Sequence, residues 1–518
     1  MNNIVNTLKK FRFHGAETIN LAGALAWNKS DRELAHQLLM TGSFGNTYYA
    51  TAEANLSLAM STFHKVALED PTWFAGALVE ARNDGFMRTM PIIGLIILRK
   101  YAPDIFKEAF SMIIHTGGDL EDFLTFTRAM GMGFGRAVKS AIKEWIKHNT
   151  NEYYAVKYRR QIADAIRITH FEENNPIYDY VVAYRKHIPE EKLIAAYKQY
   201  PQISATELVK NLLKEKQYDK ASDIIVRYRL DPATIIGSGV PDDPAIWQAL
   251  MKVMGTGMLI GYLSKLIRTG AINEDTLPWL KDRLTAKALY KAKTFPHRII
   301  TTALALKNPN HYNFYMYTQD TPDTGITTEV INILKAILPE IGKLMQNTSW
   351  NGRWIVAPDI SGSMTAPIGS NIPSYIAGAM AGMIRSIVPS AKIVPWDTEV
   401  YEDMVTLKDT PFDVAEKIVT ASGGGTFMEE PVRYMIHRKI RADYIVFITD
   451  SMEWGEGWLG YWIKYKKIFP DAKAILIRVD PYETNPFPEE AKKQHDIYQI
   501  YGWSPTVLKW IETYVLAA

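Results

Sequence analysis

The residue pattern of the chain changes abruptly at about residue 345, and this change constrains the fold more than any other feature. Beyond it, four short β-rich runs each end on an aspartate: "RWIVAPD", "AKIVPWD", "DYIVFITD" and "AKAILIRVD". Stretches with helical spacing lie between them, such as "IPSYIAGAMAGMIRSIV" and "WLGYWIKYKKIF". Strands that alternate with helices favour a mostly parallel sheet with helices on both faces. Residues 346–518 are therefore expected to form a doubly wound α/β domain.

Residues 1–345 have the apolar spacing of helices almost throughout. Segments such as "WFAGALVEAR", "DIFKEAFSMII" and "RAVKSAIKEWIKH" are separated by short breaks rich in glycine, proline, asparagine and aspartate. Short helices joined by short connections are typical of stacked antiparallel helix pairs, as in HEAT-type arrays. No clean sequence repeat accompanies them, so the prediction of an α-helical HEAT-like repeat domain depends on helix lengths and loops.

The composition narrows the class of protein. A chain of 518 residues is long enough for two or more domains. It contains no cysteine, which excludes disulfides, thiolate metal sites and cysteine nucleophiles and fits a reducing compartment. The N-terminal "MNNIVNTLKKFRFHGAE" lacks the apolar segment of a secretory signal, and "MPIIGLIIL" is too short to span a membrane. A cytoplasmic protein without a membrane partner is expected.

The formal net charge of +3 conceals an uneven distribution. Residues 352–518 contain 17 Lys and Arg against 21 Asp and Glu, so the positive excess lies in the preceding part. Within residues 128–170, nine Lys and Arg face only three Asp and Glu. A local excess of this kind predicts a surface that binds phosphates.

The basic stretch combines two features that favour anions. Glycines 131, 133 and 135 precede a helix on which Arg136, Lys139 and Lys143 share one face, and Lys147 continues the stripe. Free amide groups at a helix N-terminus and guanidinium groups both bind phosphate.

A second group of basic residues follows within the same stretch. Lys157, Arg159 and Arg160 lie beside tyrosines that could stack on unpaired bases, and Arg167 and His170 could join them. The alternative is a solvated face with the tyrosines packed inside and the histidine in a structural cap. The residues alone leave both interpretations open.

Oxygen-bearing side chains follow two of the predicted strands. Asp359, Ser361 and Ser363 alternate after the first strand, and alternate residues of an extended loop point the same way. Asp450 ends "DYIVFITD", and Thr426 follows three glycines in "ASGGGTFMEE". Ligands of doubly wound sheets bind at the carboxyl ends of the strands. Two carboxylates and three hydroxyls, without histidine or cysteine, suit Mg²⁺ or Mn²⁺ rather than Zn²⁺.

Each of these pieces alone has a simpler explanation. A Ser-Gly-Ser turn is commonly only a turn, and an aspartate after a strand often caps a helix. "GGGT" lacks the Lys-Ser/Thr of a nucleotide P-loop. A metal-assisted phosphoesterase is disfavoured, because most of the ligands are neutral hydroxyls and no histidine or lysine is their neighbour in sequence.

Taken together, the D-x-S-x-S motif, the threonine and the strand-end aspartate resemble the metal-ion-dependent adhesion site of von Willebrand factor A domains. The preceding part resembles the TROVE module of the Ro ribonucleoprotein family. The stretches that carry this resemblance are "TGSFGNTYYATAEANLSL", "GFGRAVKSAIKEW", "VKYR", "ADAIRITHF" and "DRLTAKALYKAKTFPHRIITTAL". The order of the two domains is also that of the Ro family.

The resemblance implies a ring of HEAT-like repeats in residues 1–345, closed by the A domain of residues 346–518. The family binds Y RNAs on a basic outer surface and threads single-stranded ends of misfolded non-coding RNAs through the hole. Lys157, one of Arg159 and Arg160, and His170 fall where the family contacts Y RNA, with Arg136 and Lys139 on the neighbouring helix.

The same resemblance implies a monomeric, non-catalytic protein of RNA quality control or RNA stability. It also implies Mg²⁺ or another divalent cation at the adhesion site, and an exoribonuclease or another protein as partner. The alternative is a metal-dependent protein-interaction scaffold without specific RNA binding.

Overall fold

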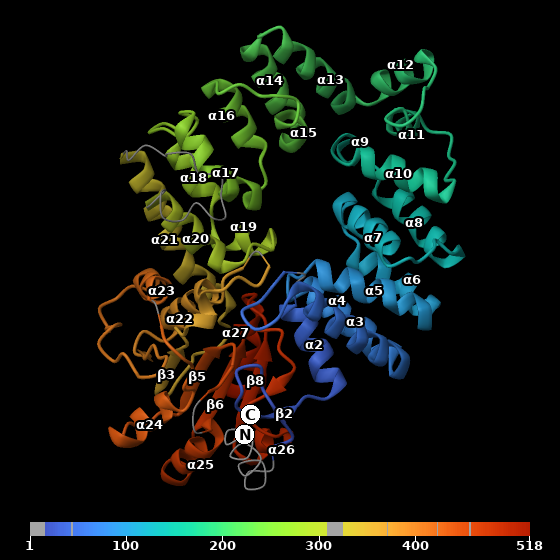
Figure 1. The fold of residues 1–518 in the computed structure, drawn as a ribbon. Coiled ribbons are helices and arrows are strands. Elements are labelled where there is room, and N and C mark those ends of the chain that lie inside the picture. Colours follow the sequence, from blue (N-terminus) through green and yellow to red (C-terminus); the bar gives the residue numbers. More distant parts are fainter. Residues whose placement is uncertain are drawn as a thin grey trace.

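The structure is a computed structural model that describes residues 16–42, 45–307, 325–369, 371–421, 423–454 and 457–517. Its helices follow one another around a ring that closes on a C-terminal α/β domain (Figure 1). The predicted fold class, helical repeats followed by a doubly wound sheet, is confirmed. The segment considered for a secretory signal lies largely outside the described residues. None of the described helices is long and apolar enough to cross a membrane.

The first arc of the ring consists of helix pairs that share one apolar core. Proline at the first position opens α4, α6 and α11, where its fixed φ suits the helix and its missing N–H costs nothing. The helices are α2 (Asp31–Thr41), α3 (Ala52–Glu69), α4 (Pro71–Asn83), α5 (Thr89–Tyr101), α6 (Pro103–Ile113), α7 (Gly117–Ala129), α8 (Arg136–Asn149), α9 (Glu152–Lys157), α10 (Arg159–Thr169), α11 (Pro176–Val182) and α12 (Glu190–Gln199).

The second arc runs from the far side of the ring back to the sheet (Figure 1). Its helices are α13 (Pro201–Lys214), α14 (Tyr218–Tyr228), α15 (Pro232–Ile236), α16 (Pro244–Val253), α17 (Thr256–Arg268), α18 (Leu277–Arg283), α19 (Ala286–Lys291), α20 (Pro296–Lys307) and α21 (Gly325–Met345). A single apolar core extends from this arc into one face of the C-terminal sheet. The division into domains at residue 345 therefore stays a prediction, because packing is continuous across it.

The C-terminal sheet is parallel, with the strand order β4-β3-β5-β6-β8. The strands are β3 (Trp354–Pro358), β4 (Lys392–Ile393), β5 (Tyr444–Thr449), β6 (Lys473–Arg478) and β8 (Ile497–Tyr501). All four predicted runs form strands, although "AKIVPWD" pairs over only two residues. Strand β8 was not predicted, because a polar glutamine, Gln499, interrupts its apolar run.

Helices cover both faces of this sheet, so its strands are buried on both sides. On β5, Val446 and Ile448 point into the core shared with the second arc, whereas Ile445 and Phe447 point to the opposite face. The helices of the domain are α22 (Pro373–Ile387), α23 (Pro411–Thr420), α24 (Glu430–His437), α25 (Trp458–Ile468), α26 (Glu489–Gln494) and α27 (Thr506–Ile511), with single helical turns at Gly362–Thr365 and Glu512–Leu516.

The expectation of helices almost throughout residues 1–345 misses a β-hairpin near the start of the chain. Strands β1 (Thr18–Ile19) and β2 (Leu25–Asn28) are antiparallel, and Gly23, with φ +94°, lies in the turn between them. Strand β2 pairs with β7 (Thr484–Asn485) of the C-terminal domain. The beginning of the ring is thus joined to its end by backbone hydrogen bonds.

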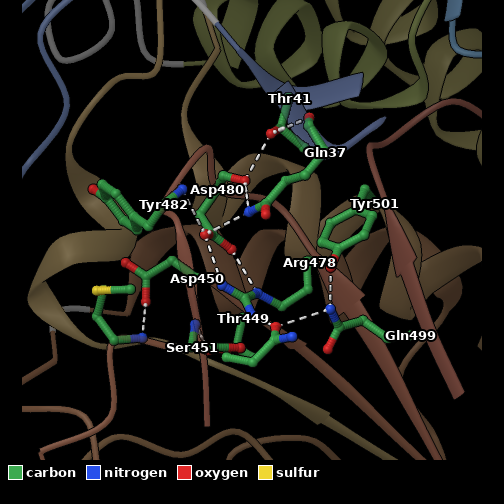
Figure 2. Close-up of polar contacts among 12 residues, drawn as sticks. Gln37, Thr41, Thr449, Asp450, Ser451, Arg478, Asp480, Tyr482, Gln499 and Tyr501 are labelled. Atoms are coloured by element: carbon green, nitrogen blue, oxygen red, sulfur yellow. Dashed lines mark hydrogen bonds and ion pairs between the residues drawn. The ribbon is translucent and has the colours of Figure 1, made fainter. Parts of the chain in front are cut away.

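Helix α2 adds a polar junction to this hairpin (Figure 2). Gln37 Nε2 and Thr41 Oγ1 donate to the Asp480 carbonyl at 2.6 and 2.7 Å. Asp480 itself forms a fully buried two-bond ion pair with Arg478, at 2.7 and 2.8 Å. The ring therefore closes on charges that are removed from water and satisfied by one another.

Glu33 of α2 carries a second part of the junction. Its Oε1 accepts hydrogen bonds from Lys492 Nζ at 2.7 Å and from the Tyr501 hydroxyl at 2.6 Å. Burial alone would raise the pKa of Glu33, but the Lys492 charge and these hydrogen bonds outweigh it and lower the pKa to about 2. The ionised carboxylate therefore stabilises the closed ring.

Glu33→Gln should lower the free energy of unfolding by about 3 kcal/mol, because it removes the carboxylate charge that the folded protein stabilises and leaves Lys492 with only the exposed Glu489 as an ionic partner. The folded pKa lies below the unfolded value of 4.5, so this stability is present above pH 4.5 and is lost as the pH falls toward 2. Urea unfolding at several pH values measures both effects. Glu191→Gln, at an exposed position of α12, should change the free energy by less than about 0.5 kcal/mol. Equal behaviour of the two variants would contradict the role of Glu33.

Candidate metal centre and nucleic-acid interface

Asp359 and Asp450 lie at the carboxyl ends of neighbouring parallel strands, β3 and β5. The backbone N–H of Asp359 donates to the Ile448 carbonyl at 2.9 Å. The Thr449 hydroxyl donates to Asp359 Oδ2 at 2.6 Å. Both aspartates are 2% exposed or less. The sheet register thus places two buried carboxylates beside each other.

The two serines join these carboxylates. The Ser361 N–H donates to Asp359 Oδ1 at 2.8 Å, and the hydroxyls of Ser361 and Ser363 are 3.2 Å apart. The Ser363 side chain also hydrogen-bonds with Asp450. Four of the five predicted ligands therefore interact directly, as the alternation in D-x-S-x-S suggests.

The glycine loop brings Thr426 to the same edge of the sheet. Gly362 N–H donates to the Gly424 carbonyl at 2.9 Å, and Trp454 N–H donates to the Thr426 carbonyl at 2.8 Å. Thr426 is therefore tied between the turn after β3 and the turn after β5, and its side chain is buried. Asp359, Ser361, Ser363, Thr426 and Asp450 are called the oxygen site below.

The electrostatics of the oxygen site favour a positive charge. Burial raises the pKa of Asp359 to about 6, and the nearby Asp397 adds to the rise. Burial, followed by the charges of Asp359 and Asp480, raises the pKa of Asp450 to about 7. Two adjacent buried carboxylates are costly when ionised, so a proton or a cation is needed between them.

The donors of the oxygen site are all hard oxygens, which fits Mg²⁺ or Mn²⁺. No three His, Asp or Glu side chains gather as metal ligands anywhere in the part of the chain that the structure describes. Hydroxyl groups would therefore supply most of the protein ligands. Such a site leaves room for water in the coordination shell.

Sequence reasoning missed two residues at this site. Asp397, buried at the end of "AKIVPWD", accepts from Gly424 N–H at 2.7 Å and from the Tyr401 hydroxyl at 3.0 Å, and so positions the glycine loop. The aspartate that closes each strand run was a signal that could have identified it. Tyr49 comes from the helical part and hydrogen-bonds with Ser363. No local pattern links those two residues.

The basic stripe on α8 is available to an outside anion. Arg136 is exposed and Lys139 and Lys143 are half-buried, and none of the three forms an ion pair with a described residue. Val138, Ile142 and Trp145 on the other side of α8 are buried in the core. Arg136, Lys139 and Lys143 therefore lie away from the buried side of α8, and their role in binding RNA stays a prediction.

Lys157, Arg159 and Arg160 have partners within the protein. Lys157 Nζ lies 3.2 Å from Oδ1 of the buried Asp231, and this charge raises the pKa of Lys157 although burial alone would lower it. Arg159 lies 3.7 Å from the Tyr180 ring centre and donates to the Tyr180 carbonyl at 2.9 Å. Arg160 pairs with Glu121. The alternative interpretation, in which these side chains have a structural role, therefore applies to them in part. Their contact with RNA stays a prediction.

Arg167 and His170 lie at the end of α10. Both are exposed, and Arg167 is 4.0 Å from Asp164. His170 ends the helix in the left-handed conformation with φ +54°, and its backbone N–H donates to the Ile166 carbonyl. Helices α8 and α10 pack against each other, so both residues belong to the same part of the ring as the stripe on α8.

Comparisons with known proteins agree with this architecture. Residues 353–458 match the family model described as the Ro60 vWA domain. The chain is 23% identical over 478 residues to the RNA-binding protein RO60 of Deinococcus radiodurans, covering 87% of this chain and 86% of that protein. The chain is homologous to the Ro proteins. The crystal structure of the Deinococcus radiodurans Ro (RSR) protein matches with a TM-score of 0.62 and 20% identity, over 92% of this chain and 98% of that one. The resemblance to Ro is confirmed, and so is the shared fold.

Gly423→Ala should destabilise the oxygen site, because a Cβ atom there would lie 1.9 Å from the Ile360 carbonyl oxygen. The expected loss of unfolding free energy is about 1–3 kcal/mol, measured by denaturant titration. Gly425→Ala is the matched control, since its nearest neighbours would lie at 3.5 Å or more. Equal stability of the two variants would show that the loop does not pack as described.

Proposed function

We propose that this protein is a non-catalytic RNA-binding scaffold of RNA quality control or RNA stability. It holds structured, Y-like RNA on the basic surface of α8 and α10 and takes single-stranded ends of misfolded RNAs into the centre of the ring. The observation that carries the proposal is the stripe of Arg136, Lys139 and Lys143, which form no ion pair with any residue that the structure describes. The relationship to a protein named RNA-binding protein RO60 supports it.

The N-terminus of α8 supports the proposal that this surface binds phosphate groups of RNA. Gly135 is the N-cap of this 14-residue helix and supplies no side-chain hydrogen bond, so the first backbone N–H groups have no cap. A phosphate placed there would accept hydrogen bonds from the backbone and from Arg136 together. The glycines before it, Gly131 and Gly133, leave open space around the backbone.

The basic residues of α9 and α10 have two different roles in this proposal. Arg160, Arg167 and His170 are exposed and extend the RNA surface of α8. Lys157 and Arg159 chiefly fix α9 and α10 through Asp231 and Tyr180. The Tyr153 hydroxyl donates to Asp231 at 3.0 Å, which ties this ring to the protein instead of leaving it for base stacking.

We also propose that the oxygen site holds Mg²⁺ or another divalent cation. Asp359, Asp450, Ser361, Ser363 and Thr426 would hold the ion directly or through water. The ion would neutralise the two carboxylates, and a water or an outside carboxylate would complete its shell. A cytoplasmic monomer is part of this proposal.

A metal-dependent scaffold that binds an exoribonuclease or another protein is the second candidate. Trp454, which is 63% exposed and follows the oxygen site in sequence, is the observation in its favour. Tryptophan is enriched among the residues that dominate protein interfaces.

The triple variant Arg136→Gln, Lys139→Gln and Lys143→Gln should weaken binding of an RNA hairpin with a single-stranded 3′ end by about tenfold at moderate salt. The slope of log affinity against log salt should fall by about 2, because about 0.7 counterion is released per single-strand phosphate contact. Filter binding over a range of salt concentrations measures both. The control, Lys464→Gln, Lys467→Gln and Lys493→Gln, removes equal charge from exposed positions of the C-terminal domain. Similar losses in both triples would refute a local RNA site.

Asp359→Asn should abolish the rise in Tm that Mg²⁺ produces in the unmodified protein, because it removes half of the carboxylate charge. RNA affinity should stay within about twofold, since the oxygen site is remote from α8 in the ring. Thermal scans with and without Mg²⁺, and the same RNA titration, test the two statements. A loss of RNA binding in a folded variant would show that the two sites are not separate.

A further inference from the structure

The N-terminal part of the ring lies against the edge of the sheet that carries the oxygen site. Asn20 Nδ2 donates to the Glu453 carbonyl at 2.8 Å, in the loop that follows Asp450. Lys29 Nζ donates to the Tyr482 carbonyl at 2.7 Å, and Gln37 and Thr41 hold Asp480 nearby (Figure 2). The loops after β5 and β6 therefore face residues 20–41 of the same chain.

Tyr49, in the turn between α2 and α3, reaches the oxygen site itself. Its ring meets the Tyr482 ring edge-on with centres 5.6 Å apart, and the Tyr48 ring packs beside it at 4.8 Å. The Tyr49 hydroxyl hydrogen-bonds with Ser363, and burial, followed by the charge of the nearby Asp450, raises the pKa of Tyr49 to about 12. A side chain from the helical part thus contacts one predicted metal ligand, Ser363, and lies near the carboxylates.

Local contacts hold Tyr49 in this position. Thr47 N–H donates to the Ala50 carbonyl at 2.8 Å, and the Thr47 side chain hydrogen-bonds with the Tyr482 hydroxyl. Asn46 Oδ1 accepts from Ala52 N–H at 2.7 Å at the start of α3. Tyr49 is half-buried, whereas its neighbour Tyr48 is 57% exposed. The turn therefore directs Tyr49, and not Tyr48, toward the oxygen site.

We propose that Tyr49 caps the oxygen site, so that this chain's own N-terminal part occupies the side from which an outside carboxylate would reach the ion. This inference rests on the proposed metal. A phenol is neutral at physiological pH and binds a hard cation weakly, so an acidic ligand would replace it once the turn at residues 45–50 moves away. Access to the ion is thereby coupled to the contact between the beginning of the ring and the C-terminal domain.

The test uses Mn²⁺ as the probe metal and acetate as the probe carboxylate on the full chain. Water-proton relaxation reports the waters that exchange at bound Mn²⁺, and electron paramagnetic resonance reports how much Mn²⁺ is bound. Tyr49→Ala should raise the relaxation enhancement and lower the acetate concentration for half-displacement, both several-fold. Tyr49→Phe keeps the ring against Tyr482 and should change the relaxation enhancement and the acetate concentration in the same directions by a smaller factor. This variant replaces Tyr49→Ala in the test if the alanine variant does not fold. Tyr48→Ala is the matched control and should change neither.

Three negative results are distinguishable. If the Tyr49 variants bind Mn²⁺ with unchanged relaxation and unchanged acetate affinity, the proposed cap is overturned and the metal site stands. No bound Mn²⁺ in the unmodified protein overturns the proposed metal and the cap with it. Equal effects of the Tyr48 and Tyr49 variants also overturn the cap, because they would show a general loosening of the turn.

Discussion

The closed ring depends on the buried ion pair between Arg478 and Asp480. Both side chains are fully buried, and the desolvation of two charges is repaid only when geometry and additional hydrogen bonds are good. Within the C-terminal domain, Arg478 donates to Asn485 and to the Thr484 carbonyl, and the Asp480 carboxylate accepts from the Tyr482 N–H. Helix α2 adds the remaining bonds: Gln37 Nε2 donates to Asp480 Oδ2 at 3.0 Å, and Gln37 and Thr41 donate to the Asp480 backbone carbonyl. Closure of the ring therefore completes the hydrogen bonding around a buried charge pair.

The sequence indicated the fold class well, because both periodicities are strong. Strands β3, β5 and β6 lie within the apolar runs that end on aspartates, and helices such as α8 lie where apolar residues recur every three or four positions. The oxygen site could be predicted from those strand ends, because neighbouring parallel strands bring Asp359 and Asp450 together. The β1–β2 hairpin and strand β8 were not predicted, because their stability comes from pairing with distant strands rather than from local pattern.

The basic residues show the limit of reading charge from sequence. Arg136 and Lys157 looked equivalent as members of one basic stretch. The structure separates them: the first is exposed, and the second faces the buried Asp231. Asp231 is 74 residues further along the chain, so no local spacing could reveal the pair. Tyr49 and Ser363 are a comparable case, because a contact between the two ends of a ring has no signature in either segment.

The two arcs of the ring differ in how they are joined to the C-terminal sheet. From α13 to the sheet a continuous apolar core crosses residue 345. The first arc meets the C-terminal domain through the β2–β7 pairing, through packing on Tyr501 and through buried hydrogen bonds and ion pairs. Apolar burial does not depend on pH, whereas a contact made by an ionised carboxylate does. The ring therefore has one joint that responds to acid, beside Glu33, and one that does not, at α21. Acid should loosen the ring at the Glu33 side first.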